Sequence, residues 1–180
     1  DVYSCGKISD DMNNNNKFSL RPLTDNDADS LARQLNNKKV WDNLRDALPY
    51  PYTSQDAAWF INFQQNDPLL TCYGIVVDGE VVGNIGFTRS EDIERFTAEV
   101  GYYIGEDYWG QGIMSAALSE AVEDYFKTTE VVRLFATPFD YNKASAKVLE
   151  KAGFTLKCIF TKGAYKNGQF VDMLYYERIK

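Results

Sequence analysis

The chain has 180 residues, and its 26 acidic and 19 basic side chains give it a net charge of -7 at pH 7. This length suits one domain with one core, and an apolar content of 44% is ordinary for a folded protein. The sequence has no histidine, which excludes every mechanism that needs a Ser-His pair, a Cys-His pair or a histidine-bound metal. Proton transfer must therefore use carboxylates, hydroxyls, amines, thiols or water.

The cysteines and the charge balance exclude several kinds of site and partner. Cys5, Cys72 and Cys158 are isolated from one another, whereas disulfide frameworks and zinc sites need paired or clustered cysteines. We therefore expect no metal, a reducing cytoplasmic location, and core positions for Cys72 and Cys158. No apolar run approaches the roughly 18 residues of a membrane span, and the acidic balance argues against nucleic acid or an anionic membrane as partner. A cationic amine suits this charge.

The spacing of apolar residues predicts the elements in chain order. Residues 1–17 are polar and rich in asparagine, so we expect a disordered tail before a single domain at 18–180. The first half should contain a strand at 18–23, a helix between Thr24 and Leu35, a helix at 40–48, a helix capped by Ser54 that runs to Gln65, and strands at 71–77 and 80–89. The second half should contain a strand at 97–104, a helix at 111–126, a strand at 131–138, a helix at 142–152, and strands at 154–162 and 170–178.

Two local signals and the order of the elements indicate the fold class. Asp78-Gly79 between two strands predicts a tight type I′ hairpin, and Gly153 is placed to end the preceding helix. Helices come first, an antiparallel meander follows, and two later helices cross between strands before a closing hairpin. This order is typical of one mixed α+β domain.

The segment with the clearest chemical signal is VGYYIGEDYWGQGIMSAAL at 100–118, where a predicted strand passes through a glycine turn into a helix. Unpaired amides at a helix start favour an anion, and Gly110 and Gly112 let a phosphate approach the backbone closely. Such short glycine patterns also occur in turns that only connect elements. A dinucleotide fold is disfavoured, because it needs glycine where this chain has Ser115 and places its motif in the first strand-helix unit.

A second segment, DYNKASAKVLEKAGF at 140–154, follows the next predicted strand. Together the two segments resemble the acyl-CoA-binding core of the GCN5-related N-acetyltransferase (GNAT) superfamily. The sequence YWGQGI followed by NKASAKVLEKAGF looks most like the ribosomal-protein-alanine N-acetyltransferase (RimJ/RimL-like) branch of that superfamily. The resemblance covers residues 18–178. It implies a GNAT-like acyl-CoA N-acyltransferase fold: a central, mostly antiparallel twisted sheet of about seven strands, with splayed middle strands and flanking helices.

The resemblance also implies acetyl-CoA as cosubstrate, held between the strand that ends near Ile104 and the strand that ends near Pro138. The pantetheine arm would pair with the first strand and with Asn142, the pyrophosphate would lie on the amides of 110–115, and Lys147 would bind a CoA phosphate. The implied cofactor-binding residues are Tyr102, Tyr103, Ile104, Trp109, Gly110, Gln111, Gly112, Ile113, Met114, Ser115, Asn142 and Lys147.

The turn departs from the family pattern at its outer positions. Members carry Arg or Gln, then Gly, then Gly or Ala, where this chain has Trp109, Gly112 and Met114. A methionine there can point into the core without blocking the amides. Lys147 also fits the alternative of a solvated helix face.

Acetyl transfer needs a neutral amine, and deprotonating an amine with a pKa near ~10.4 at pH 7 costs about 4 to 5 kcal/mol. By the resemblance, Glu99 is the base, at the start of the strand that leads to the turn. Strand alternation places it on the same face as Gly101 and Tyr103. The alternative is a surface carboxylate paired with Lys or Arg.

The leaving thiolate needs a proton donor. Many members carry a tyrosine where this chain has Leu149, and in the ribosomal-protein branch a serine takes that part, which implies Ser145 here. The alternative is a serine that bonds back to its own helix, with Tyr102 and Tyr141 as other donors. A backbone amide near Tyr103 would hold the oxyanion.

These features predict direct transfer of an acetyl group from acetyl-CoA to a primary amine in a ternary complex, without a covalent enzyme intermediate. The acceptor is a protein N-terminus or a small-molecule amine, and we expect a monomer or a homodimer. One alternative is a catalytically inactive acyl-CoA-binding or sensing module. Another is a protein-interaction domain that uses exposed aromatic residues around Trp41, Tyr50, Tyr52 and Trp59.

Overall fold

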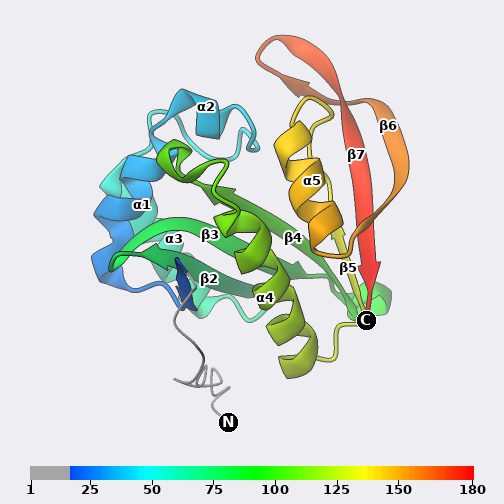
Figure 1. The fold of residues 1–180 in the computed structure, drawn as a ribbon, viewed down its shortest axis with the longest axis horizontal. Helices are drawn as coiled ribbons and strands as arrows, with labels where there is room; N and C mark the ends of the chain where they lie inside the picture. The colour runs from blue at the N-terminus through cyan, green and yellow to red at the C-terminus, as the bar shows by residue number, and fades with distance from the viewer. Residues whose placement is uncertain (1–16) are drawn as a thin grey trace.

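The computed structural model describes residues 17–180 and arranges seven strands in one sheet, in the order β1-β2-β3-β4-β5-β7-β6 (Figure 1). The strands are β1 (Ser19–Arg21), β2 (Leu70–Val77), β3 (Glu80–Arg89), β4 (Thr97–Ile104), β5 (Arg133–Ala136), β6 (Thr155–Lys166) and β7 (Gln169–Ile179). All neighbours pair antiparallel except β4 and β5, which confirms the expected, mostly antiparallel sheet. The tail predicted at 1–17 lies, except for its last residue, outside the described residues.

The helices lie on both faces of this sheet. They are α1 (Ala28–Leu35), α2 (Lys38–Trp41), α3 (Ser54–Asn66), α4 (Ile113–Thr128) and α5 (Lys143–Lys151), with short 3-10 turns η1 (Asp25–Asp27), η2 (Asp92–Glu94) and η3 (Glu106–Tyr108). α4 and α5 cover the face turned to the viewer in Figure 1, and α1 and α3 pack on the opposite side. Within 17–180, no helix has both the length and the apolar content needed to cross a bilayer.

The tight hairpin is confirmed. Asp78 and Gly79 both have positive φ, 50° and 83°, which is the backbone of a type I′ turn. Asn167 and Gly168 repeat this geometry, with φ of 51° and 79°, and join β6 to β7. The bounds predicted for β3 and β4 match those observed.

Two predictions about the leading helices were wrong. The helix expected at 40–48 ends at Trp41, because the chain then turns back and the Trp41 indole N–H donates to the Leu48 carbonyl at 2.9 Å. The cap of α3 is Thr53 rather than Ser54: its hydroxyl accepts from the Asp56 amide at 3.2 Å, and the Asp56 carboxylate accepts from the Thr53 amide at 2.8 Å. This reciprocal pair satisfies two amides at the helix start.

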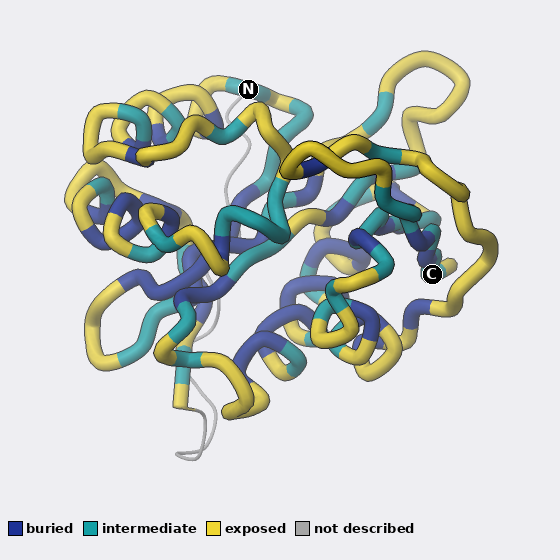
Figure 2. Tube along the Cα trace, turned by 90° about the horizontal axis from the view of Figure 1, so that it is seen from above, coloured by how far each residue is buried: buried dark blue, intermediate teal, exposed yellow. Residues whose placement is uncertain are grey.

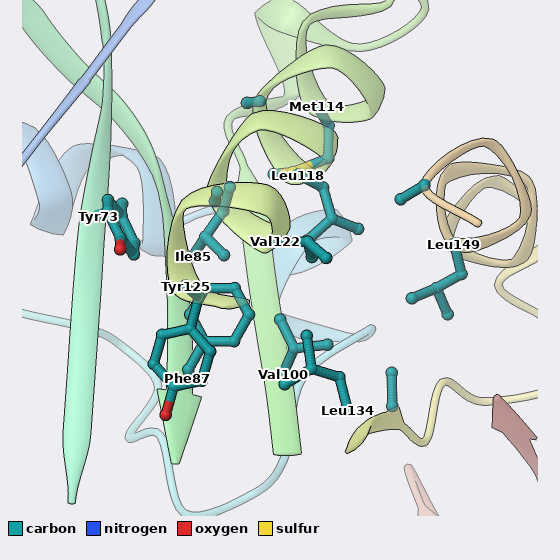
Figure 3. Packing of buried hydrophobic residues seen from close by; sticks show 14 of the residues in the cluster. Tyr73, Ile85, Phe87, Val100, Met114, Leu118, Val122, Tyr125, Leu134 and Leu149 are labelled. Carbon is teal, nitrogen blue, oxygen red and sulfur yellow. The ribbon is translucent and has the colours of Figure 1, made fainter. Parts of the chain in front are cut away.

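Two clusters of buried side chains fix the layers. The larger one joins α4 and α5 to the sheet; in it the rings of Phe87 and Tyr125 stack 4.2 Å apart, and Leu118 and Leu149 are fully buried (Figure 3). The smaller one joins α1 and α3 to the other face. Figure 2 shows buried chain concentrated in the centre and exposed chain along the outer loops. Met114 belongs to the larger cluster, so its side chain points into the core, as expected.

The middle of the sheet opens between β4 and β5. Their parallel pairing covers only Thr97–Glu99 on β4, opposite residues 133–135 of β5, although β4 continues to Ile104. The other edge of β4 stays paired with β3 up to Ile104. The predicted splay of the middle strands is therefore confirmed, and it leaves half of one strand edge without a neighbouring strand.

Leu118→Ala should lower the free energy of unfolding by about 2 to 5 kcal/mol, because it removes a fully buried side chain from between α4 and the sheet. Urea unfolding followed by circular dichroism measures this change. Leu156→Ala is the matched control: Leu156 is 45% exposed, and its loss should stay within about 0.5 kcal/mol. Equal losses in the two variants would contradict the proposed core.

Candidate active site

The unpaired edge of β4 presents main-chain groups to the opening. Gly105 donates to the Val82 carbonyl at 2.8 Å and Ser90 donates to the Thr97 carbonyl at 2.9 Å, one bond at each end of the β3-β4 ladder. Antiparallel pairs alternate, so odd-numbered residues of β4 direct their N–H and C=O to β3. The amides of Tyr102 and Ile104 therefore face the opening.

This register narrows the expectation that a backbone amide near Tyr103 would hold the oxyanion. The Tyr103 amide itself points toward Asn84 of β3 and is part of the ladder. The Tyr102 amide, one residue earlier on the same strand, faces the opening instead. Neighbouring residues of a strand direct their main-chain groups to opposite edges of that strand. The spacing of apolar residues in a sequence does not show which edge a given amide faces.

The glycine turn before α4 leaves a row of amides without partners. Gly110 and Gly112 have φ of +70° and +78°, a left-handed backbone that side chains disfavour, and a Cβ built on either would meet nothing within 4 Å. Among residues 17–180, none of the amides from 110 to 115 donates to a protein group. No acidic side chain lies in the first turn of α4. The turn thus fits a phosphate group.

Two side chains brace this turn. The Trp109 indole N–H donates to the Ile104 carbonyl at 2.9 Å, and Gln111 Nε2 donates to the Asp107 carbonyl at 2.9 Å. Trp109 thus ties the turn back to the end of β4 without using any of the free amides. Gln111 is the one predicted cofactor-binding residue whose side chain does not line the cavity described below.

α5 brings two predicted residues to the opening. Asn142 caps the helix, because its Oδ1 accepts from the Ser145 amide at 3.1 Å, and its Nδ2 has no partner in the described part of the chain. That Nδ2 is available to a ligand carbonyl. Lys147 is exposed on the same helix and lines the cavity.

Ser145 contacts a neighbouring strand rather than its own helix. Its Oγ lies 2.7 Å from the Tyr102 hydroxyl, which also reaches the Ser145 carbonyl at 3.2 Å. Burial raises the pKa of Tyr102, so this phenol keeps its proton at neutral pH. When Tyr102 donates to Ser145, the serine proton remains free for a third group.

Glu99 lies at the end of the β4-β5 pairing, on the face of the sheet opposite to Tyr102. Its Oε1 accepts from Arg45 at 2.7 Å and from Thr137 at 3.1 Å. Both contacts use the same oxygen, so Oε2 has no protein partner within 17–180. The ion pair that the sequence left as an alternative does form. Its cation comes from the irregular segment 42–48, where sequence spacing gives no signal.

One cavity of about 970 Å³ connects these groups across the sheet. On the α4-α5 side it is lined by the glycine turn, by Asn142 and by Ser145. The opposite side is called the acceptor side below. Its floor consists of residues that face each other across β3 and β4: Thr88 and Glu99, Gly86 and Gly101, and Asn84 and Tyr103. A long substrate can therefore enter from one face while a second substrate approaches from the other.

Of the two cysteines expected in the core, Cys72 is buried as expected and Cys158 is not. Cys72 is buried, but it lines the acceptor side of the cavity, and burial raises its pKa to about 12. A thiol with this pKa stays protonated, which disfavours it as a nucleophile. Cys158 is exposed on β6 rather than buried, because that edge strand has no covering helix. Within 17–180, no cluster of acidic or cysteine side chains could hold a metal ion.

The segment 42–48 closes the acceptor side, and the β6-β7 turn holds it in place. Lys166 is almost fully buried; its Nζ lies 2.6 Å from Asp46 and 3.3 Å from the Trp41 ring centroid. Asn167 donates to Asp42 at 2.9 Å. The C-terminal hairpin is thus fastened to the first third of the chain at the entrance of the cavity.

Such a site suits a cosubstrate that is long, bears phosphates at one end, and has a reactive carbonyl at the other. It places this protein in the class of acyl-CoA-dependent acyltransferases. The sequence model of the family described as "Acetyltransferase (GNAT) domain" matches residues 17–155, and the chain belongs to that family. It transfers an acetyl group from acetyl-CoA to an amine.

The similar proteins include ribosomal-protein acetyltransferases, the branch expected from the sequence, and an amino-acid acetyltransferase. The ribosomal-protein-serine acetyltransferase of Escherichia coli (strain K12) is 27% identical over 168 residues, or 90% of this chain and 92% of that protein. The L-amino acid N-acetyltransferase AaaT of the same organism is 30% identical over 58% of this chain and 65% of its own length. The structure of RimL, a ribosomal alpha-N-protein acetyltransferase in complex with coenzyme A, has a TM-score of 0.82 at 25% identity and covers 92% of this chain and 95% of that chain.

Gly112→Ala should weaken acetyl-CoA binding about tenfold. An alanine in the left-handed region costs about 1 to 2 kcal/mol, and a backbone that leaves this region to relieve the strain would turn the free amides away from the phosphate. Isothermal titration calorimetry measures the affinity. Gly79→Ala is the matched control: Gly79 has φ of +83° and open space around it, in a hairpin outside the cavity. Equal acetyl-CoA affinity in the two variants would exclude the turn as the anion site.

Proposed function

We propose that the amine attacks acetyl-CoA directly in a ternary complex, with Glu99 as the base and Ser145 as the acid. The observation that carries this proposal is the opening beside β4, where free main-chain amides face the gap and one cavity reaches both faces of the sheet. The pantetheine arm pairs with Tyr102 and Ile104 as an added strand and receives a hydrogen bond from Asn142. The pyrophosphate lies on the amides of the glycine turn, and Lys147 contacts a CoA phosphate.

The transfer balances with the groups present. The amine nitrogen forms a bond to the thioester carbonyl carbon, and the Tyr102 amide stabilises the oxyanion that develops. The carbon-sulfur bond then breaks, and the sulfur takes its electron pair. Glu99 Oε2 accepts the amine proton, directly or through a water, and Ser145 donates a proton to the thiolate while Tyr102 holds its oxygen. Solvent then takes the proton from Glu99 and returns one to Ser145, so both side chains regain their starting states. The products are an N-acetylated amine and the CoA thiol.

We further propose that the acceptor is the α-amine of a peptide chain rather than a polyamine. Both carboxylates that line the acceptor side, Glu99 and Asp46, already pair with cations, Arg45 and Lys166. A second ammonium group would find no free anion there. An α-amine, with a pKa of about 7.7 to 8.0, is also easier to deprotonate than a lysine side chain. The names of the ribosomal-protein acetyltransferases support this choice.

Similarity to these relatives argues against the alternative that this chain is an inactive CoA-binding module, because the relatives are named as acetyltransferases. The four residues expected in an aromatic interaction surface differ in exposure. Tyr52 is buried and Trp41 lies against Lys166, whereas Tyr50 and Trp59 are exposed, so two of the four remain available for such a surface. We propose that residues 18–180 act as one cytoplasmic domain, as a monomer or homodimer, without a nucleic acid or membrane partner.

Glu99→Gln should reduce kcat/KM at pH 7 by roughly 100-fold, because the amide cannot accept the amine proton. The rate should recover as the pH rises through the amine pKa, since solvent then supplies the neutral amine. The dependence of the rate on pH is measured by thiol release at pH values from about 6 to about 10, a range that brackets the α-amine pKa.

Glu80→Gln is the control for this change, because Glu80 pairs with Arg33 at 3.1 Å on the surface, outside the cavity. Its pH profile should equal that of the unchanged protein. An unaltered profile for Glu99→Gln would remove Glu99 from the mechanism.

Ser145→Ala should lower kcat about 10- to 100-fold with little change in acetyl-CoA affinity, because the hydroxyl acts when the carbon-sulfur bond breaks. Single-turnover kinetics and calorimetry separate the two effects. Ser119→Ala is the control, since Ser119 donates to the Ser115 carbonyl within α4 at 2.8 Å. A loss of affinity without a loss of turnover would make Ser145 a binding residue instead.

A further inference from the structure

The acceptor side of the cavity ends in four polar side chains, Tyr52, Cys72, Asn84 and Tyr103, which we call the inner pocket. Three of them, Tyr52, Cys72 and Asn84, are at least nine-tenths buried, and Tyr103 is half-buried. Apolar side chains of the N-terminal helices, among them Leu35, Val40 and Phe60, line the same region. A polar cluster inside an apolar wall normally pairs its groups with one another.

Asn84 is not paired in this way. Its Oδ1 is fully buried and has no hydrogen-bond partner in the described part of the chain. The Nδ2 reaches only Cys72 Sγ, at 4.0 Å, which is the distance of a weak contact. A buried polar atom without a partner costs about 1 to 3 kcal/mol, so its retention points to a partner that arrives from outside the chain.

The two tyrosine hydroxyls make no hydrogen bond to another described residue either, but unlike Asn84 Oδ1 they are not fully enclosed. Burial raises the pKa of Tyr52 to about 12 and that of Tyr103 well above its usual value, so both remain neutral donors and acceptors. Cys72 is neutral for the same reason. The inner pocket therefore offers hydrogen bonds but no charge.

The inner pocket lies next to the place of reaction. Gly101 stands between Glu99 and Tyr103 on the same face of β4, and a Cβ there would meet nothing within 4 Å. The Cα atoms of Glu99 and Tyr103 are each about 7 Å from that of Gly101 along the strand, and both side chains can lean toward the space over Gly101. An amine in that space therefore has the base on one side, while a substituent on the carbon that bears the amine faces the inner pocket on the other.

We propose that the inner pocket binds a small uncharged polar group, a hydroxyl or a carboxamide, carried next to the acceptor amine, and that Asn84 is the specificity-determining residue. The inference rests on the proposed α-amine acceptor, and it specifies the chemical class of the first side chain in the acceptor peptide. An N-terminal Ser, Thr or Asn supplies the missing hydrogen bonds. Alanine leaves them unmade, and a lysine or glutamate side chain would bring a charge to neutral partners.

The test compares peptides that differ only in their first residue: Ser, Thr, Ala, Val, Lys and Glu. We expect kcat/KM for Ser to exceed that for Ala, and for Thr to exceed that for isosteric Val, by about 3- to 10-fold, as one or two neutral hydrogen bonds allow. Asn84→Leu should reduce both ratios to near one and leave acetyl-CoA affinity unchanged. It should keep or raise the melting temperature, because it removes a buried unsatisfied group.

Gln64→Leu is the matched control. Gln64 is a buried carboxamide on α3 that donates to the Ile61 carbonyl at 3.1 Å and does not line the cavity. It should leave the Ser to Ala ratio unchanged. A melting temperature lowered by Asn84→Leu with the ratios intact would make Asn84 a structural residue and overturn the proposal.

Peptide binding in the presence of CoA, measured by calorimetry, separates this inference from the proposed function. Preferential binding of the Ser peptide without acetylation of any peptide would support the inner pocket and overturn the proposed acceptor reaction. Acetylation of all six peptides at equal kcat/KM, with equal binding, would overturn the inner pocket and leave the proposed function standing.

Discussion

The site depends on one interruption of a hydrogen-bonded sheet, the end of the parallel pairing between β4 and β5 after Glu99. Inside a protein, main-chain amides without partners are costly, and sheets normally avoid them. Here the amides of Tyr102 and Ile104 stay open on one edge, because the other edge of β4 remains anchored to β3. The same interruption lets a cavity pass between the two faces of the sheet, so that a thioester and an amine can approach each other from opposite sides.

In the proposed complex the two faces use different parts of the chain for recognition. The proposed cofactor binding relies on the backbone, because the free amides of the glycine turn and the edge of β4 are available whatever side chains surround them. This explains why Trp109 and Met114 can depart from the family pattern, since one braces the turn through Ile104 and the other packs in the core. Acceptor binding relies on side chains instead, and the proposed selectivity of Asn84 can change without disturbing the cofactor site.

Local signals in the sequence were sufficient for the strands, the Asp78-Gly79 hairpin and the glycine turn, because each depends on residues close together in the chain. They were not sufficient for the contacts of Glu99 and Ser145. Arg45 lies 54 residues before its carboxylate partner, and Tyr102 lies 43 residues before Ser145, so only the tertiary fold brings them together. The Trp41 indole bond that ends α2 early and the direction of the Tyr103 amide also depend on three-dimensional pairing. Asn84 gave no signal, because an unsatisfied carboxamide is recognisable only from its surroundings.

The fastening of Lys166 to Asp46 and Trp41 has a consequence for the order in which the enzyme is completed. During translation the N-terminal helices, β4 and the glycine turn leave the ribosome well before the closing hairpin. The segment 42–48 can pair with Glu99 through Arg45 once β4 has been made, but its contacts with Lys166 and Asn167 form only after the β6-β7 turn has emerged. The wall beside the acceptor is therefore begun by residues made early and completed by residues made last.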